Sequence, residues 1–227
     1  MMGNIVHQVL EEWWVSRGDI AEVFERVYAQ VLRAQHIPSG YHTERLRNQM
    51  VDDLLRFSSQ DTWPRSEFTS EVEKKFELPL MEGIQINGRI DRIDTGPDGR
   101  SWVIDYKYSS AANVKGKLKN ENLLQAPLYL IAAEEAFGTK PAGVFYVGLK
   151  GGLEYVGWGE TPFQGAVSIP ENWPAVTRDR VRQIAESIRS GKVEIAPADP
   201  DKCRWCDARD VCRVEGLGAT VQAEEGA

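Results

Sequence analysis

The sequence predicts an α/β domain with a mixed central sheet flanked by helices, followed by a short cysteine-containing segment. Three observations lead to this class. Helical periodicity covers residues 4–35 and 43–60, and strand-like segments separated by turn residues follow. A further helix interrupts the strands, and a last helix follows them. A length of 227 residues suits one large domain, alone or with an appendage, and the hydrophobic share of 42% is enough for a core.

Two helical segments open the chain. Residues 4–35 are predicted to form one helix, because Ile5, Val9 and Trp13 fall on one stripe. The stretch HIPSGYH, rich in turn-forming residues, breaks this helix. A second helix is predicted over residues 43–60, and its apolar side carries Leu46, Met50, Leu54 and Phe57.

Strands are predicted over residues 70–80, 84–94 and 101–108. The first shows apolar alternation, and the turn GPDGR joins the other two into a hairpin. The remaining elements are a helix over residues 120–138, strands over 142–151 and 153–160, and a helix over 171–191.

The overall composition excludes several classes of protein. No apolar run approaches the roughly 18 residues needed to cross a bilayer, so no membrane partner is expected. The first residues lack the pattern of a signal peptide, which predicts a cytoplasmic location. The net charge of −7 argues mildly against a protein that coats nucleic acid, although residues 107–119 contain four lysines and no acid. A phosphate-binding loop of the type found in ATP motors is also absent from the sequence.

The predicted hairpin gathers carboxylates and a lysine. Because strand side chains alternate, Asp105 and Lys107 share one face of the third strand. The short turn allows Asp91 on the preceding strand to lie opposite this pair. Asp94 is three positions from Asp91, so it faces the other way and is expected to cap the turn at Gly96.

Two interpretations of this hairpin are open. Neighbouring carboxylates raise each other's pKa unless a cation neutralises them, and hard oxygen ligands select Mg²⁺ or Mn²⁺. Lys107 could then hold a water molecule near the metal or neutralise charge on a phosphoryl oxygen. Alternatively, the hairpin is an ordinary charged surface, and its Lys–Asp pair contributes only about 0 to 1 kcal/mol.

Three cysteines near the C-terminus, Cys203, Cys206 and Cys212, have the spacing C-x₂-C-x₅-C. An odd, clustered set is not typical of a disulfide framework. The spacing suits zinc or an iron–sulfur cluster, and either would need a fourth ligand. The alternative is a set of three thiols that bind nothing.

The stretches GRIDRID and VIDYK together resemble the nuclease motif of the PD-(D/E)xK superfamily, and above all its RecB-like branch. This resemblance implies a restriction-endonuclease-like fold. It also implies that Asp91 and Asp105 bind metal, that Lys107 is catalytic and that the backbone carbonyl of Tyr106 is a further ligand. Ile90 stands where the superfamily name has proline, which is usual in this branch.

Further segments are similar to that branch in the expected order. GNIVHQVLEEWW resembles its G-x-x-x-H helix, which makes His7 a candidate metal ligand, although a lone helical histidine is more often structural. QAPLY resembles its Q-x-x-x-Y helix, which implies that Gln125 and Tyr129 contact nucleic acid or brace the site; they could also be a polar edge on a core helix. Glu71 is a candidate accessory acid, or else an exposed strand carboxylate.

The cysteine spacing resembles the iron–sulfur subset of RecB-like nucleases, which includes AddB-type subunits and CRISPR adaptation nucleases. There a [4Fe-4S] cluster joins three C-terminal cysteines to one far upstream. The 227 residues contain no fourth cysteine. The expectation is therefore an isolated nuclease domain whose cluster lacks one ligand; a partly occupied cluster, a zinc site and an empty site are the alternatives.

The predicted function is that of a Mg²⁺- or Mn²⁺-dependent DNA nuclease, an exonuclease on single-stranded DNA or DNA ends in repair or recombination, with a helicase or recombination subunit as partner. A basic loop with Lys115, Lys117 and Lys119 could grip phosphates, or could be merely solvated. The rivals are a catalytically silent DNA-binding or scaffolding domain and a phosphohydrolase of small molecules. The expected boundaries are 1–195 for the nuclease domain, 196–215 for the cysteine segment and 216–227 for a disordered tail.

Overall fold

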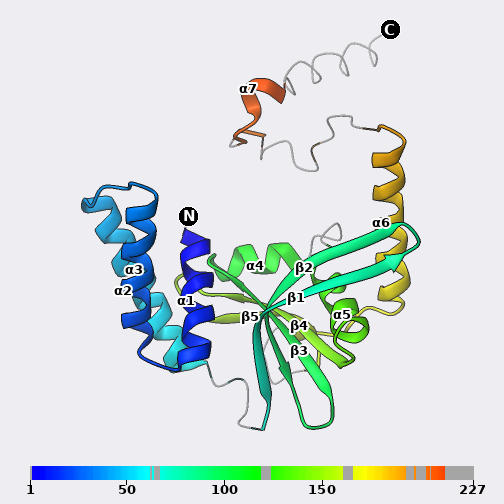
Figure 1. Ribbon diagram of the computed structural model, residues 1–227, viewed down its shortest axis with the longest axis horizontal. Helices are drawn as coiled ribbons and strands as arrows, with labels where there is room; N and C mark the ends of the chain where they lie inside the picture. The colour runs from blue at the N-terminus through cyan, green and yellow to red at the C-terminus, as the bar shows by residue number, and fades with distance from the viewer. Residues whose placement is uncertain are drawn as a thin grey trace. The chain divides into compact units, whose positions relative to one another are not determined.

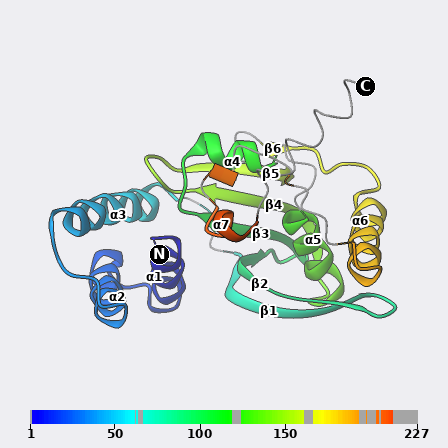
Figure 2. The same cartoon turned by 90° about the horizontal axis from the view of Figure 1, so that it is seen from above.

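The computed structural model describes residues 2–61, 63, 67–118, 124–160, 166–192, 197, 203–204 and 206–212. The chain forms two compact units, Met1–Asp179 and Arg180–Ala227. Figure 1 labels the elements except β6, which is labelled in Figure 2. In chain order they are α1 (Met2–Ser16), α2 (Ile20–Ala34), α3 (Tyr41–Gln60), β1 (Thr69–Met81), β2 (Ile84–Thr95), β3 (Arg100–Lys107), α4 (Ala111–Leu118), α5 (Gln125–Glu135), β4 (Lys140–Gly148), β5 (Glu154–Gly159), β6 (Ala166–Val167), α6 (Trp173–Arg189) and α7 (Arg209–Cys212).

The strands of the first unit form one mixed sheet in the order β1-β2-β3-β4-β5-β6. The pairs β1–β2, β2–β3 and β4–β5 are antiparallel, whereas β3–β4 and β5–β6 are parallel. A parallel neighbour requires a crossover connection, and the segment that carries α4 and α5 supplies it between β3 and β4. The prediction of an α/β domain with a mixed sheet is therefore confirmed.

Helices cover the two faces of this sheet differently (Figure 2). The main core joins α1, α2 and α3 to one face, where Trp14 and Phe57 pack with Tyr106 and Phe145. On the other face, α5 packs against β1, β3 and β4. Because side chains alternate along a strand, β3 sends Tyr106 to the three-helix side and Asp105 to the α5 side.

The first 35 residues form two helices, so the prediction of a single helix over 4–35 is wrong. α1 ends at Ser16, Arg17 has a positive φ of 53°, and α2 begins at Ile20. The side chain of Asp19 accepts a hydrogen bond from the backbone N–H of Ala21 at 2.7 Å, which caps the new helix. The apolar periodicity continues across the break, so the spacing of apolar residues does not reveal the turn.

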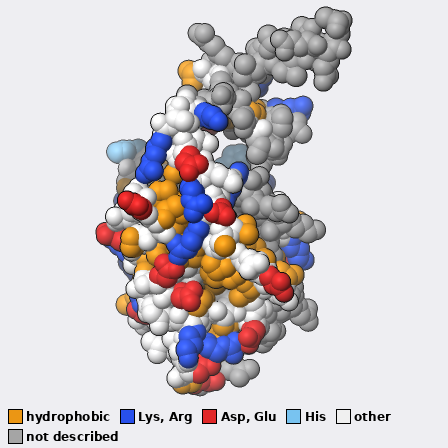
Figure 3. Space-filling model, turned by 90° about the vertical axis from the view of Figure 1, so that its right-hand side faces the viewer, with side chains coloured by type: hydrophobic (Ala, Val, Ile, Leu, Met, Phe, Trp, Pro, Cys, Tyr) orange, Lys and Arg blue, Asp and Glu red, His pale blue; other side chains and the backbone are white. Residues whose placement is uncertain are grey.

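One face of the molecule carries mixed charge. On the face drawn in Figure 3, basic, acidic and hydrophobic side chains are interspersed, so this face is not uniformly acidic although the net charge is −7. In the part of the chain that the structure describes, each helix is too short or too polar to cross a membrane.

Candidate active site

The candidate site lies where β2 and β3 separate. The last pair of their ladder is Arg92–Ile104, although both strands continue beyond it. Past this pair, Oδ2 of Asp91 accepts a hydrogen bond of 2.8 Å from the backbone N–H of Tyr106. A side chain thus takes the place of a ladder hydrogen bond. This contact holds the Asp91 carboxylate in the opening between the two strands.

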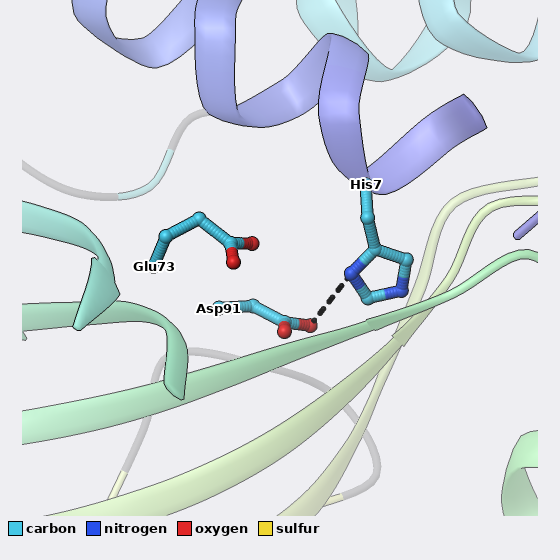
Figure 4. A group of neighbouring side chains, drawn as sticks. All are labelled: His7, Glu73 and Asp91. Carbon is cyan, nitrogen blue, oxygen red and sulfur yellow. Dashed lines mark ion pairs between the residues drawn. The ribbon is translucent and has the colours of Figure 1, made fainter. Parts of the chain in front are cut away.

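Three potential metal ligands meet at this opening (Figure 4). His7 comes from α1, Glu73 from β1 and Asp91 from β2, and one ligand atom of each lies within 4.8 Å of the others. Nδ1 of His7 is 3.4 Å from Oδ2 of Asp91. Glu73 lies opposite Asp91, because the flanking residues pair as Val72–Arg92 and Lys74–Ile90.

Glu73 is the functional candidate that the sequence analysis missed. The Glu71 side chain is 49% exposed and pairs with Lys74, whereas the Glu73 side chain is only 10% exposed and faces the candidate ligands. Counting outward from the Glu82–Gly83 turn could have placed residue 73 or 74 opposite Asp91. A register shift between Pro79 and Met81 then selects residue 73.

A second group of side chains adjoins these ligands on β3 and α5. Oδ2 of Asp105 forms an ion pair with Lys107, and Oδ1 of Asp105 accepts a hydrogen bond of 2.8 Å from Nε2 of Gln125. Oε1 of Gln125 lies 3.4 Å from Nζ of Lys107. The amide of Gln125 therefore contacts both members of the ion pair and restricts where each of them can lie.

The helix α5 ties this group to β2. Besides its bond to Asp105, Nε2 of Gln125 lies 2.9 Å from the Tyr129 hydroxyl. That hydroxyl donates in turn to the backbone carbonyl of Arg89 at 3.0 Å. Gln125 and Tyr129, one turn apart on α5, thus brace the two strands from one side of the sheet.

The pKa values of two carboxyl groups and of the histidine in this site are raised. Burial of Asp105, reinforced by the charge of Asp91, raises the pKa of Asp105 to about 6 despite the neighbouring Lys107. Burial also raises the pKa of Glu73, because the pairing with Arg89 only partly offsets it. For His7, burial opposes protonation, but the hydrogen bond and charge of Asp91 outweigh it, and the pKa is raised.

The donor set fits a divalent cation. Oδ2 of Asp105 and Oε2 of Glu73 are buried and accept no hydrogen bond within the described residues, although each lies beside the cation of an ion pair. A divalent ion would satisfy these oxygens and offset the charge of Asp91, which adds to burial in raising both pKa values. One imidazole and several carboxylate oxygens are ligands that Mn²⁺ and Mg²⁺ accept.

The metal affinity is expected to fall at least about tenfold between pH 7.5 and pH 5.5, because metal ligands must be deprotonated and the pKa values of Asp105 and His7 are both raised. Calorimetric titration with Mn²⁺ at the two pH values measures this. In a His7→Gln variant, the pH dependence should become shallower, since only the carboxylates then titrate. An affinity that does not change with pH would contradict the assigned ligands.

The backbone carbonyl of Tyr106 stays a predicted ligand. In a strand, the N–H and C=O of one residue point toward the same neighbouring strand. Because the N–H of Tyr106 bonds to Asp91, its carbonyl is expected to face the same opening.

On the opposite face of β2, Asp94 is buried and does not cap the turn at Gly96. Its carboxylate accepts hydrogen bonds from Trp63 at 2.9 Å and Ser70 at 2.7 Å, and it pairs with Arg92 at 3.0 Å. The prediction that Asp94 faces away from Asp91 is correct, but its role as a turn cap is wrong. Oδ1 of Asp98 instead accepts a hydrogen bond from the backbone N–H of Arg100 in the turn.

The lysines beyond the site lie partly on a helix. The structure places Lys115 and Lys117 in α4, so the expected basic loop is helical at least to Leu118. Lys115 forms an ion pair with Glu154 of β5, which partly neutralises the charge of Lys115. Lys119 and the side chain of Lys117 lie outside the described residues.

The cysteine segment belongs to the second unit, which begins at Arg180. Cys203, Cys206 and Cys212 are free thiols, and Cys206 is exposed. Among the described residues, one group of three His, Cys, Asp or Glu side chains has ligand atoms within 4.8 Å of one another, and it consists of His7, Glu73 and Asp91. The three cysteine sulfur atoms therefore do not lie this close together. The whole expected tail at 216–227, and residues 193–196 at the expected boundary near 195, lie outside the described residues.

Comparisons with known proteins identify the relatives of this chain. Residues 1–213 match the profile of the PD-(D/E)XK nuclease superfamily. The chain is 42% identical over 60 residues to one subunit of an ATP-dependent helicase/deoxyribonuclease from Streptococcus uberis, covering 26% of this chain and 6% of that protein. The same subunit from Streptococcus agalactiae is 32% identical over 97 residues, or 42% of this chain and 8% of the relative.

Among solved structures, a candidate exonuclease from Eubacterium rectale superposes with a TM-score of 0.53 and 14% identity, over 92% of this chain and 75% of that one. This likeness shows a shared fold. The chain spans less than a tenth of the two curated relatives described above. The profile match covers nearly the whole sequence and includes each residue of the opening between β2 and β3, and the chain therefore belongs to the PD-(D/E)XK nuclease superfamily.

Proposed function

We propose that this chain is a Mg²⁺- or Mn²⁺-dependent nuclease that hydrolyses phosphodiester bonds in single-stranded DNA or at DNA ends, in repair or recombination. The observation that carries the proposal is the meeting of Asp91 and Asp105 with Lys107 at the point where two strands separate. The named activity of the helicase/deoxyribonuclease relatives supports DNA as the polymer and a helicase as the partner.

The residues divide the chemical work. Asp91 and Asp105, with His7 and Glu73, would hold the cation, which when bound supplies positive charge to the phosphate under attack. The ammonium of Lys107 adjoins Asp105 and donates hydrogen bonds only, so it can orient an attacking water and offset charge on a phosphoryl oxygen. Gln125 holds Lys107 and Asp105 in this arrangement.

Cleavage of end-labelled single- and double-stranded DNA tests the proposal. We expect products with Mg²⁺ or Mn²⁺ and none with EDTA. Lys107→Ala should cleave about 10² to 10³ times more slowly, because a positioned donor is lost. Lys140→Ala, which removes an exposed lysine at the start of β4, is the matched control and should cleave normally.

Other results would contradict this function in identifiable ways. Wild-type protein that binds DNA but never cleaves it would be a scaffolding domain. Preference for a small phosphodiester such as bis-p-nitrophenyl phosphate over DNA would indicate a phosphohydrolase of small molecules. Undiminished cleavage by Lys107→Ala would remove the assigned lysine from the mechanism.

The proposal includes an iron–sulfur cluster at Cys203, Cys206 and Cys212, with its fourth ligand supplied from outside this chain. Thiolates at this spacing are ligands for such a cluster or for zinc. Iron and acid-labile sulfide should be found in protein purified without oxygen. One zinc per chain without iron would reject the cluster and leave the nuclease site unaffected.

A further inference from the structure

Arg89 lies at the edge of the candidate site, between the metal ligands and solvent. Nε of Arg89 is 2.6 Å from Oε2 of Glu73, and the Arg89 side chain is 55% exposed. Arg89 is two residues from Asp91, so both point from the same face of β2. The hydrogen bond from Tyr129 to the Arg89 carbonyl fixes its backbone. The guanidinium is therefore anchored beside the site but remains accessible from water.

Two cations can compete for the carboxylate of Glu73. One is Arg89, which pairs with it; the other is a metal ion, because Glu73 offers an oxygen within 4.8 Å of ligand atoms of His7 and Asp91. Figure 4 shows the Glu73 and Asp91 carboxylates directed toward His7. A divalent ion has twice the charge of a guanidinium and is attracted by both carboxylates. Metal binding would therefore weaken the pair between Glu73 and Arg89.

A guanidinium that has lost its counter-ion is a strong phosphate ligand, because its planar donors match two phosphate oxygens. We propose that Arg89 binds a phosphate of the DNA. In the metal-free protein Arg89 is held in its ion pair with Glu73, and metal binding releases it from this pair. This inference rests on the proposed nuclease function and adds a regulation of the same site. DNA would then bind tightly only to metal-loaded protein, and by linkage DNA would also raise the metal affinity.

The DNA arm of the test uses Lys107→Ala protein, which keeps the candidate ligands but should cleave slowly. Fluorescence anisotropy with a labelled single-stranded oligonucleotide is measured in Mn²⁺ and in EDTA. Adding Arg89→Ala should weaken binding roughly tenfold in Mn²⁺ and less than about twofold in EDTA. In Mn²⁺ it should also reduce the slope of log affinity against log salt concentration by about one.

The metal arm measures free Mn²⁺ by electron paramagnetic resonance without DNA. Arg89→Ala should raise the Mn²⁺ affinity about three- to tenfold, because the competitor for Glu73 is gone. In a Glu73→Gln background, Arg89→Ala should change the affinity less than about twofold. An equal increase in Mn²⁺ affinity in both backgrounds would mean simple repulsion between Arg89 and the metal. It would overturn the proposal that the two compete for Glu73.

Arg100→Ala is the matched control, since it removes a partly exposed, ion-paired arginine at the opposite end of β3 from Lys107. It should alter neither affinity. Equal loss of DNA binding by Arg89→Ala in Mn²⁺ and EDTA, or no loss at all, would overturn the proposal. Failure of the nuclease function is separate, because it shows as uncut DNA with wild-type protein, whereas these affinities are measured without cleavage.

Discussion

Asp105→Asn should lower the DNA cleavage rate by about 10³-fold or more and, at the same time, stabilise the metal-free protein. The loss is expected because Asp105 is both a candidate metal ligand and the ion-pair partner of Lys107. The gain is expected because the Asp105 carboxylate is 1% exposed and has a pKa raised to about 6. The folded protein thus disfavours the ionised form that it carries at neutral pH.

The sign of the stability effect follows from proton linkage. The pKa of Asp105 is about 6 in the folded state and about 3.9 in the unfolded chain. The folded state therefore holds the proton more tightly, and stability falls as the pH rises from about 4 to about 6. Above this window, Asp105→Asn should raise the free energy of unfolding by about 1 to 2 kcal/mol.

Thermal unfolding in EDTA at pH 7.5 and pH 4.5 measures this effect. The variant should melt a few degrees higher than wild type at pH 7.5, and the difference should shrink at pH 4.5. Addition of Mn²⁺ should reverse the order at pH 7.5, because wild type is expected to bind the ion and to be stabilised by it. A variant that is less stable than wild type in EDTA at pH 7.5 would show that the Lys107 pair outweighs the cost of burial.

The second large effect is expected from Arg92→Met, on the face of β2 away from the candidate ligands. The Arg92 side chain has 0% exposure and pairs with Asp94 at 3.0 Å and Asp61 at 3.4 Å. Its Nη1 donates to the Tyr106 hydroxyl at 2.6 Å, and its guanidinium lies 4.4 Å from the ring centre of Trp14. The network therefore links β2 to β3, to α1 and to the end of α3.

Removal of Arg92 would leave two buried carboxylates without their counter-ion. Breaking a buried charge pair in this way costs about 3 to 5 kcal/mol of the free energy of unfolding. For a chain of this size, the midpoint of thermal unfolding should fall by roughly 6 to 20 °C. Arg100→Met, which breaks a more exposed pair with Glu160, should cost only about 0 to 1 kcal/mol and serves as control.

A compensated variant separates charge from packing. Arg92→Met combined with Asp61→Asn and Asp94→Asn removes the uncompensated charges and should recover most of the lost stability. Urea unfolding of the three proteins measures the difference. A cost below about 1 kcal/mol for Arg92→Met, or no recovery in the compensated variant, would show that the network contributes little.

Much of the sheet could be predicted from local patterns. Strand alternation is a property of neighbouring residues, so the placement of Asp105 and Lys107 on one face and Tyr106 on the other followed from their spacing alone. The turn residues between β2 and β3 located the hairpin for the same reason. The break after Ser16 was missed, because the apolar period of α1 continues into α2 and only Asp19 marks the cap.

Long-range pairing could not be predicted with the same certainty. Glu71 and Glu73 have the same strand phase, and both are carboxylates near the expected place. The observed pairing places Glu73 opposite Asp91 and Glu71 opposite Ile93, and a one-residue register shift near Pro79 puts residue 73 rather than 74 at this place. Glu73 also has a positive φ of 50°. Asp94 likewise needed tertiary information, because its partners Trp63 and Ser70 come from segments far along the chain.

The sequence by itself determined the superfamily, the order of most elements and the residue types at the opening between β2 and β3. Motifs and periodicities depend only on residues that are close together in the sequence. The tertiary structure decided which carboxylate joins His7 and Asp91, that Gln125 contacts both Asp105 and Lys107, and that Arg89 pairs with Glu73. These are contacts between residues distant in sequence. Their geometry depends on register and on how α1 and α5 pack on the sheet, which no local pattern specifies.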